Sequence, residues 1–485
     1  MFIYFFNQLI NYYYVMFQIN SFLKFVRQGL RVWILVPACV SFLLCSCEET
    51  NTGWDPGKPP TVSNFYPQTG KFLDRVMLVG ENFPTDVNQV KVYFNARRAP
   101  ITGSSGTHMT ALAPRLPGGE EVEVPLSKNR HRKCIISVVV GKDSVSFVGD
   151  FIYEESTSSI TIAGNGSCAE LVTGSLKDAV LQPTYLCADK FGNVFVCNRG
   201  DGAFGRGSDN GNCGSGRNAL LRLNEEEDII EQVGGQTSNA PAADPTTGLI
   251  MVPTEQFRES YYTADPLEGW ITRTKTYTWT HDTGLPPNGW KHCMALNPDD
   301  GYIYTWYRTS PGYLVKIQPE LGEATVIYTH GSGDTDCFGL TFREGEANIL
   351  YLTFTNNGSS SRSHGIYTMD VSSDEPGETF MRINAEGQGH RDGPLSTAMF
   401  NCPMQLFKDP DGFLYIADRD NHCIRRITPD NMVETVLGMP GNPGYQDGSK
   451  ETALFRFPCG IAVTPDGTVY VADGGNNRIR KISIN

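Results

Sequence analysis

The chain has 485 residues, a length that suggests about three domains of ~150 residues each. Its 40% hydrophobic and 19% charged residues are the proportions of a folded protein and exclude wholesale disorder. The net charge of −13 excludes a broad electrostatic nucleic-acid binder, which needs a basic surface, so no nucleic acid is expected as a partner.

Residues 1–47 have the composition of an export signal. They contain no acidic residue, and three basic residues precede an apolar stretch from Val32 to Leu44. This stretch has signal-peptide length and is too short for a comfortable membrane-spanning helix. It ends in Cys45-Ser46-Cys47, which resembles the bacterial lipobox, so Cys47 is expected to carry lipid and anchor the chain to a membrane. An ordinary cleaved signal or a short anchor is the alternative.

The residues around this signal refine the expected cell address. Met16 directly precedes the basic region, so the true start is either Met1 or Met16. The acidic pair Glu48-Glu49 resembles the surface-export signal of Bacteroidetes lipoproteins, which implies an outer-membrane protein exposed at the cell surface. Residues 48–58 form a linker at the start of a Gly/Pro-rich tether.

Residues 59–155 alternate short apolar runs with turns, which predicts a small β-sandwich. The segment opens with Pro60-x-Val62-x-x-Phe65-x-Pro67-x-x-Gly70 and continues with Gly80-x-Asn82-Phe83. These motifs resemble the opening and the hallmark turn of TIG (IPT) immunoglobulin-like domains. The resemblance implies a spacer or interaction module.

Residues 158–485 repeat one pattern. The segments that start at Pro403 and Pro458 share an Asp-Gly turn and a Tyr-x-Ala-Asp strand, 55 residues apart. A third copy starts at Pro183, four periods before Pro403. Weaker copies at 244–251, 297–304 and 344–352 complete six units. A period of 40–55 residues with four short strands per unit is typical of a β-propeller.

The repeats resemble NHL repeats, including a lead-in from Thr435 to Pro458 and a second one from Gly387 to Pro403. The predicted fold is therefore all-β, with a TIG/IPT immunoglobulin-like β-sandwich followed by a six-bladed NHL-type β-propeller. The segment Ser159–Ala163 is expected to complete the last blade beside Ile479–Ile484, because this removes open sheet edges. Cys197 matches alanines of the other copies and is expected in the core.

Two loops are longer than their counterparts and are candidate binding loops. The connection from Asn198 to Leu220 is rich in glycine and polar residues, as is the connection from Phe354 to Ile366. Long polar loops on a rigid scaffold often carry function, although a flexible insertion is an equal alternative. The candidate ligand contacts in these loops are Phe204, Arg206, Asp209, Asn356 and Asn357.

Aromatic residues cluster between 257 and 313, where four of the five tryptophans outside the leader lie. Sugar rings stack their C–H faces on aromatic rings and need fixed polar partners for their hydroxyls, so this cluster indicates a carbohydrate site. Packing in the blade core is the alternative. The predicted ligand-binding residues are Trp270, Trp279, Trp290, Trp306, Tyr262, Arg258 and Arg308.

Catalytic signals are weak. The eight histidines show no HxxxH or HxH spacing, and no GxSxG motif occurs. No catalytic residue, metal ligand or cofactor is predicted, and the chain is not expected to be an enzyme. Because some propeller relatives are metal-dependent lactonases or zinc lyases, a metal-dependent hydrolase or lyase is one alternative.

The predicted function is a cell-surface lipoprotein that binds an extracellular glycan, or another envelope ligand, through the propeller, with the TIG domain as a spacer. The domain order resembles the accessory binding proteins of Bacteroidetes polysaccharide-uptake systems. This implies a polysaccharide or oligosaccharide ligand and an outer-membrane transport complex as partner. A protein–protein interaction scaffold in such a complex is the second alternative.

Overall fold

The computed structural model describes residues 54–124, 130–199, 218–235, 239–254, 259–331, 336–343, 345–355 and 363–484. Strands dominate these residues, and the helical elements among them are 3-10 helices of three or four residues. This confirms the predicted all-β class. The 3-10 helices are η1 (Val87–Gln89), η2 (Pro266–Glu268), η3 (Pro376–Thr379), η4 (Leu395–Thr397), η5 (Arg419–Asn421) and η6 (Gly474–Asn476).

Residues 61–155 form three four-stranded sheets around one hydrophobic core that includes Phe65, Phe94 and Phe151. In hydrogen-bonded order the strands are β1 (Thr61–Tyr66), β3 (Arg75–Glu81), β7 (His108–Leu112) and β6 (Ile101–Ser104); β11 (Asp143–Ser146), β10 (Ile136–Val140), β4 (Val90–Phe94) and β5 (Arg97–Ala99); and β2 (Thr69–Gly70), β12 (Phe151–Glu155), β9 (Arg130–Cys134) and β8 (Glu121–Val122). Buried and exposed residues alternate along β3 and β12, as expected when one face of a strand packs on the core.

The geometry of the hallmark turn explains its sequence. Asn82 has a φ of +60°, a conformation that Asn tolerates better than most residues, and its Nδ2 donates a hydrogen bond of 2.6 Å to the carbonyl oxygen of Lys58. A Cβ at Gly80 would lie 2.1 Å from the carbonyl oxygen of Thr61. Glycine and asparagine are therefore required where the chain crosses the end of β1.

Residues 157–484 form six further sheets among the described residues, one for each predicted repeat unit. In hydrogen-bonded order they are β14 (Gly174–Ser175), β18 (Ile229–Gly234), β17 (Ala219–Asn224), β16 (Val194–Asn198) and β15 (Pro183–Ala188); β19 (Ala242–Ala243), β20 (Ile250–Pro253), β21 (Ser260–Ala264) and β22 (Thr272–Thr276); β23 (Thr278–Trp279), β27 (Glu323–His330), β26 (Gly312–Gln318), β25 (Ile303–Arg308) and β24 (Trp290–Leu296); β28 (Cys337–Arg343), β29 (Glu346–Phe354), β30 (Gly365–Asp370) and β31 (Met381–Arg382); β32 (Gly393–Pro394), β36 (Met432–Leu437), β35 (Cys423–Ile427), β34 (Leu414–Asp418) and β33 (Pro403–Lys408); and β37 (Gly448–Ser449), β13 (Thr157–Ala163), β40 (Arg478–Ile484), β39 (Val469–Asp473) and β38 (Pro458–Val463). We number these sheets 1 to 6 in this order.

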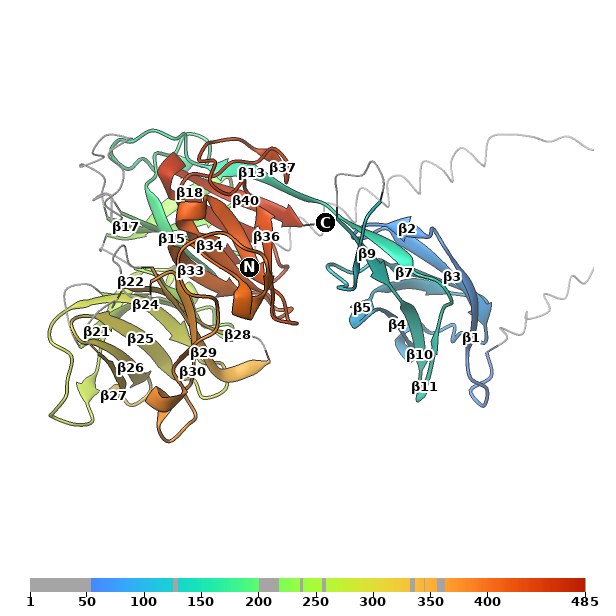
Figure 1. The fold of residues 1–485 in the computed structure, drawn as a ribbon, viewed down its shortest axis with the longest axis horizontal. Coiled ribbons are helices and arrows are strands. Elements are labelled where there is room, and N and C mark those ends of the chain that lie inside the picture. Colours follow the sequence, from blue (N-terminus) through green and yellow to red (C-terminus); the bar gives the residue numbers. More distant parts are fainter. Residues whose placement is uncertain are drawn as a thin grey trace, which may run out of the picture. The chain divides into compact units, whose positions relative to one another are not determined.

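The six sheets follow one another in a closed ring. The inner strands β15, β19, β24, β28, β33 and β38 contact one another in this order, and β38 of sheet 6 contacts β15 of sheet 1. As predicted, β13 belongs to the last sheet and pairs antiparallel with β40, with Ser159 opposite Ile482 and Ala163 opposite Ile479. Figure 1 shows the teal strand β13 beside the red strands β40 and β37. Because β13 and β40 come from the two ends of residues 157–484, their pairing protects strand edges that would otherwise be open.

A buried hydrogen-bond network explains the most repetitive part of the sequence. In sheet 5, Arg425 donates to Asp418 and Asp392, and Asn421 donates to the carbonyl oxygen of Gly389. Residues 55 positions later make the same contacts in sheet 6. They are Arg480 with Asp473 and Asp447, and Asn476 with Gly444. The network ties the lead-in loop of each of these sheets to its second and third strands.

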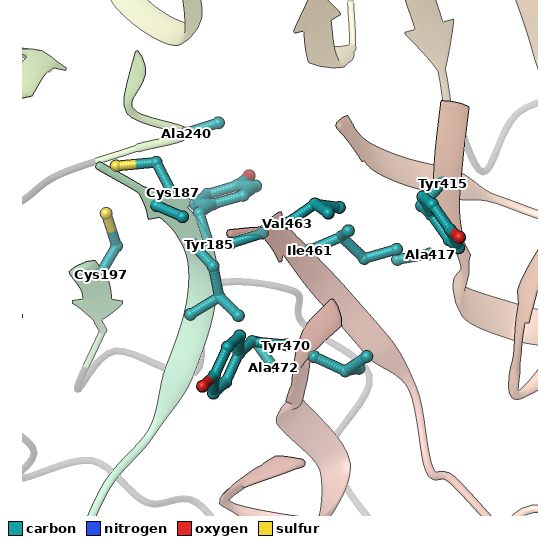
Figure 2. Packing of buried hydrophobic residues seen from close by; sticks show 14 of the residues in the cluster. Tyr185, Cys187, Cys197, Ala240, Tyr415, Ala417, Ile461, Val463, Tyr470 and Ala472 are labelled. Carbon is teal, nitrogen blue, oxygen red and sulfur yellow. The ribbon is translucent and has the colours of Figure 1, made fainter. Parts of the chain in front are cut away.

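The ring core is formed by apolar residues of the inner strands (Figure 2). Tyr185, Cys187 and Cys197 are fully buried in it, together with Ala472 of sheet 6. Eight cysteines in the described residues are free and buried, whereas Cys168 is disulfide-bonded. The expected core role of Cys197 is confirmed.

Residues 53–485 form one compact unit, and charged side chains connect its two parts. Glu155, at the end of β12, accepts hydrogen bonds from Arg132 at 3.2 Å and from Arg426 at 2.8 Å. Arg132 and Arg426 both also bind Glu434, at 2.7 and 2.9 Å. Each charge in this cluster has partners of opposite sign, which offsets the cost of burying it.

Candidate functional site

A cavity of about 450 Å³ lies at the centre of the ring, at the end of the inner strands where the chain turns toward the next strand of each sheet. We call it the axial cavity. Its lining comes from all six sheets and includes Ala188, Asp189, Lys190, Ala240, Pro241, Ala242, Ala243, Pro245, Met294, Ala295, Leu296, Pro298, Leu340, Thr341, Phe342, Gln405, Leu406, Phe407, Lys408, Asp409, Pro410, Val463, Thr464 and Pro465.

Gln405 crosses between sheets at the wall of the axial cavity. Its Oε1 accepts hydrogen bonds from the backbone N–H of Leu186 at 2.9 Å and of Ile461 at 3.1 Å. Its Nε2 donates to the carbonyl oxygen of Leu186 at 2.6 Å. One buried amide thus joins the inner strands of sheets 5, 6 and 1 and gives the cavity a fixed wall.

The lining is apolar with a few polar groups. Apolar residues form most of it, including its alanines and prolines, Leu340 and Phe342, and charged side chains such as Lys190, Lys408 and Asp409 lie in or next to the turns. A volume of this size and a mainly apolar wall with few polar groups are usual for sites that bind small organic molecules. The arrangement can hold a compact ligand and orient it from one side.

Acidic residues at the start of these turns fix the backbone around the cavity. Oδ1 of Asp409 accepts hydrogen bonds from the N–H groups of Asp411 at 2.8 Å and Phe413 at 2.9 Å. Asp189 makes the same two contacts with Phe191 and Asn193. Burial raises the pKa of Asp409 to about 6 and also raises the pKa of Asp189. These carboxylates thus act first as turn caps.

Two of the four predicted tryptophans are buried. Trp306 is fully buried, with its ring centre 5.3 Å from that of Phe354 and 5.4 Å from that of His330. Trp270 is buried against Phe195, with ring centres 4.8 Å apart. Both side chains pack in the core because they lie on strand or turn positions that face the neighbouring sheet.

Trp279 and Tyr262 are only partly accessible. The indole Nε1 of Trp279 donates a hydrogen bond of 3.1 Å to Glu259, and the ring packs edge-on to Tyr277. Tyr262 lies on β21 and packs partly against the ring core. Both therefore contribute to blade packing.

Trp290 is the predicted tryptophan that remains open, with 50% of its surface exposed. The guanidinium carbon of Arg308 lies 5.2 Å from the centre of its ring, and Arg308 also forms an ion pair with Asp336. Trp290 begins β24 and pairs with Arg308 at the end of β25. The axial cavity is reached at the opposite end of these strands, about 20 Å away for a seven-residue strand.

The remaining predicted site residues lie outside the described residues. They are Arg258, Phe204, Arg206, Asp209, Asn356, Asn357 and the lipidation candidate Cys47. Within the described ranges, no group of three or more His, Cys, Asp or Glu side chains is placed to hold a metal ion. The same ranges contain no helix with the length and hydrophobicity needed to cross a membrane.

Sequence reasoning missed the axial cavity, although the repeat itself carries a signal for it. The residues just before each first turn, such as Lys408 and Val463, occupy equivalent positions in different units. Equivalent positions of a closed ring converge on its axis. An alignment of the six units by these positions would have identified the residues that line the axial cavity.

Two family models match parts of the chain. The IPT/TIG domain model matches residues 60–148, and the NHL repeat model matches residues 455–482. The chain thus combines an IPT/TIG domain with an NHL-repeat propeller fold.

Among curated proteins, the chain is 30% identical over 109 residues to the chloroplastic protein SUPPRESSOR OF QUENCHING 1 of Arabidopsis thaliana, and 38% identical over 88 residues to Teneurin-3 of Mus musculus. These matches cover 22% and 15% of this chain. They span only 10% and 3% of the length of the two relatives.

Solved structures from Bacteroides share the fold over most of this chain. A protein of unknown function from Bacteroides thetaiotaomicron matches 89% of this chain and 100% of its own, with a TM-score of 0.72 and 22% identity. A protein described as an auxiliary nutrient binding protein from Bacteroides ovatus matches 89% of this chain and 99% of its own, with a TM-score of 0.54 and 19% identity. At these identities the likeness establishes the fold.

Proposed function

We propose that this chain is a lipid-anchored binding protein of the bacterial outer membrane, exposed at the cell surface, that holds part of an extracellular glycan in the axial cavity. In this proposal it delivers the glycan to an outer-membrane transport complex, and the IPT/TIG domain is a spacer between the anchor and the ring. The axial cavity is the single observation that carries the proposal.

Three features support it. The cavity has the size and the mixed apolar and polar wall of a small-molecule site, and every sheet of the ring contributes to it. The lipobox-like Cys45-Ser46-Cys47 and the acidic pair after it support export and anchoring. The full-length likeness to a protein described as an auxiliary nutrient binding protein supports a nutrient as the ligand class.

The axial cavity lies away from the tryptophans of the aromatic cluster. Two of these are buried in the core, and Trp290 with Arg308 lies at the other end of the strands. A glycan bound at the exposed ring of Trp290 is therefore the competing location. The two locations predict different sensitivities to substitution.

Affinity electrophoresis through gels that contain different polysaccharides tests the proposal. Thr341→Trp adds bulk at the lining of the axial cavity, and Thr325→Trp adds the same bulk to the half-buried surface of β27, away from the cavity. We expect one polysaccharide to retard the wild type and Thr325→Trp but not Thr341→Trp. Retardation lost only in Trp290→Ala would move the site to the opposite face, and retardation by no polysaccharide would reject glycan binding.

A further inference from the structure

A groove of about 580 Å³ lies between sheets 1 and 6, on the same side of the ring as the mouth of the axial cavity. We call it the rim groove. It shares Lys190, Thr464 and Pro465 with the cavity, so the two hollows meet at a common wall. Its lining is Lys190, Phe191, Gly192, Asn193, Leu223, Asn224, Glu225, Glu226, Thr464, Pro465, Asp466, Tyr470 and Lys481.

An exposed aromatic ring forms one side of the rim groove. Phe191 is 61% exposed, although a phenyl ring normally gains free energy by burial. Its backbone N–H is fixed by Asp189, and its ring edge lies so close to Gly248 that a Cβ there would approach it to 2.9 Å. The ring is therefore held in place while most of its surface stays open.

Polar groups form the other side and are held by their own contacts. Both carboxylate oxygens of Glu225 lie 3.1 Å from Nζ of Lys481, and the hydroxyl of Tyr470 donates to Glu225 as well. Burial and Glu225 raise the pKa of Tyr470, so its hydroxyl keeps its proton at neutral pH. Asn224 and the exposed Glu226 add an amide and a second carboxylate at the same turn.

This combination matches the chemistry of a sugar ring. A pyranose presents a C–H face to an aromatic ring and hydroxyls, each a donor and an acceptor, around its edge. The groove offers a largely exposed phenyl ring, with Nζ of Lys190 5.0 Å from the ring centre, together with acceptors and donors that are already positioned. Its three carboxylates outnumber its two lysines, which disfavours sulfated or uronic acid units.

We propose that the rim groove is a subsite for neutral saccharide units beside the axial cavity, so that a chain of sugars lies over their common wall and reaches both. This inference rests on the proposed function. It adds that affinity depends on chain length, because only a longer oligosaccharide reaches from the cavity to Phe191.

A microarray of neutral gluco-, manno-, galacto- and xylo-oligosaccharides of graded length, with uronate and sulfated oligosaccharides beside them, tests this. The protein is the chain from Gly53 onward, which forms one compact unit. Phe191→Ala removes the aromatic face, and Leu321→Ala removes a side chain of similar exposure (63%) from another turn as a matched control. Thr341→Trp reports on the cavity, and melting temperatures confirm that each variant folds.

We expect the wild type to bind longer neutral oligosaccharides best, Phe191→Ala to lose about tenfold in affinity for these but not for the shortest binders, and Leu321→Ala to match the wild type. Unchanged binding by Phe191→Ala with weaker binding by Thr341→Trp would overturn the subsite and leave the proposed function standing. An equal loss at all lengths, or a preference for sulfated or uronate chains, would also overturn the subsite. Binding to no glycan would reject both proposals.

Discussion

Nη1 of Arg480 donates a hydrogen bond of 2.8 Å to Oδ2 of Asp473, and neither side chain has exposed surface. Arg480 also donates to the hydroxyl of Ser159 at 3.0 Å, and so it contacts β13, the strand at the N-terminal end of the ring. Arg480 therefore makes the buried hydrogen bond that recurs in sheets 5 and 6 and also stabilises the strand pairing that closes the ring. Removing one partner of such a buried pair leaves an uncompensated charge in the core.

Arg480→Met should lower the free energy of unfolding by about 3–5 kcal/mol, because Asp473 then keeps a buried charge without its partner. Urea unfolding monitored by tryptophan fluorescence measures this. Arg391→Met, which removes an exposed arginine from a lead-in loop, is the control and should change stability by less than about 0.5 kcal/mol. Equal effects of the two substitutions would contradict the role assigned to the buried pair.

Ending the chain after Asn477 should abolish cooperative folding of the ring. This truncation removes β40, which pairs with both β13 and β39, and leaves two unpaired strand edges. Circular dichroism and size-exclusion chromatography report the outcome, with the chain from Gly53 to Asn485 as control. A truncated protein that still melts in one sharp transition would show that closure by β13 is dispensable.

Trp306→Ala should destabilise the protein by about 3–5 kcal/mol, because it opens a cavity between Phe354 and His330. Trp290→Ala should cost less than about 1 kcal/mol, because half of this residue is already exposed. Thermal melts of the two variants compare these costs. A larger loss in Trp290→Ala would contradict the assignment of Trp306 to the core.

Asp409→Asn should change the pH dependence of stability. Oδ2 of Asp409 is buried without a hydrogen-bond partner, and burial raises the pKa of this carboxyl from 3.8 to about 6 in the fold. The folded protein therefore holds this proton more tightly than the unfolded chain, and the stability that results is lost as the pH rises through about 6.

The variant should therefore gain stability relative to the wild type, by roughly 1–3 kcal/mol, between pH 4 and pH 7. Urea unfolding at both pH values provides the measurement. Asp430→Asn is the control, since Asp430 is exposed and lies in a different turn. A difference between variant and wild type that stays constant with pH would contradict the raised pKa.

The repeat spacing predicted most of the ring because the motif residues make the same contacts in each copy. Asp418, Arg425 and their counterparts 55 residues later bind identically, so similar sequence reports similar structure. The closing strand was also predictable, since the last unit lacked a fourth strand and the segment at Ser159 had no other partner. Sheets 2 to 4 were less clear, because they do not repeat this network.

The site was harder to predict, for two physical reasons. Whether a tryptophan on a strand faces core or solvent depends on which neighbouring sheet covers it, and Trp306 and Trp290 differ in this although both lie on paired strands. The axial cavity is lined by short segments of six sheets, and no single stretch of sequence contains more than six of its 24 lining residues.

Hydrogen–deuterium exchange of the chain from Gly53 onward, with and without the polysaccharide that retards it most in the gels, tests the central claim most directly. We predict slower exchange at the turns that form the axial cavity, including 241–245, 294–298, 405–410 and 463–465, and unchanged exchange around Trp290 and Arg308. Slower exchange confined to Trp290 and Arg308, or no change in any segment, would contradict binding in the cavity.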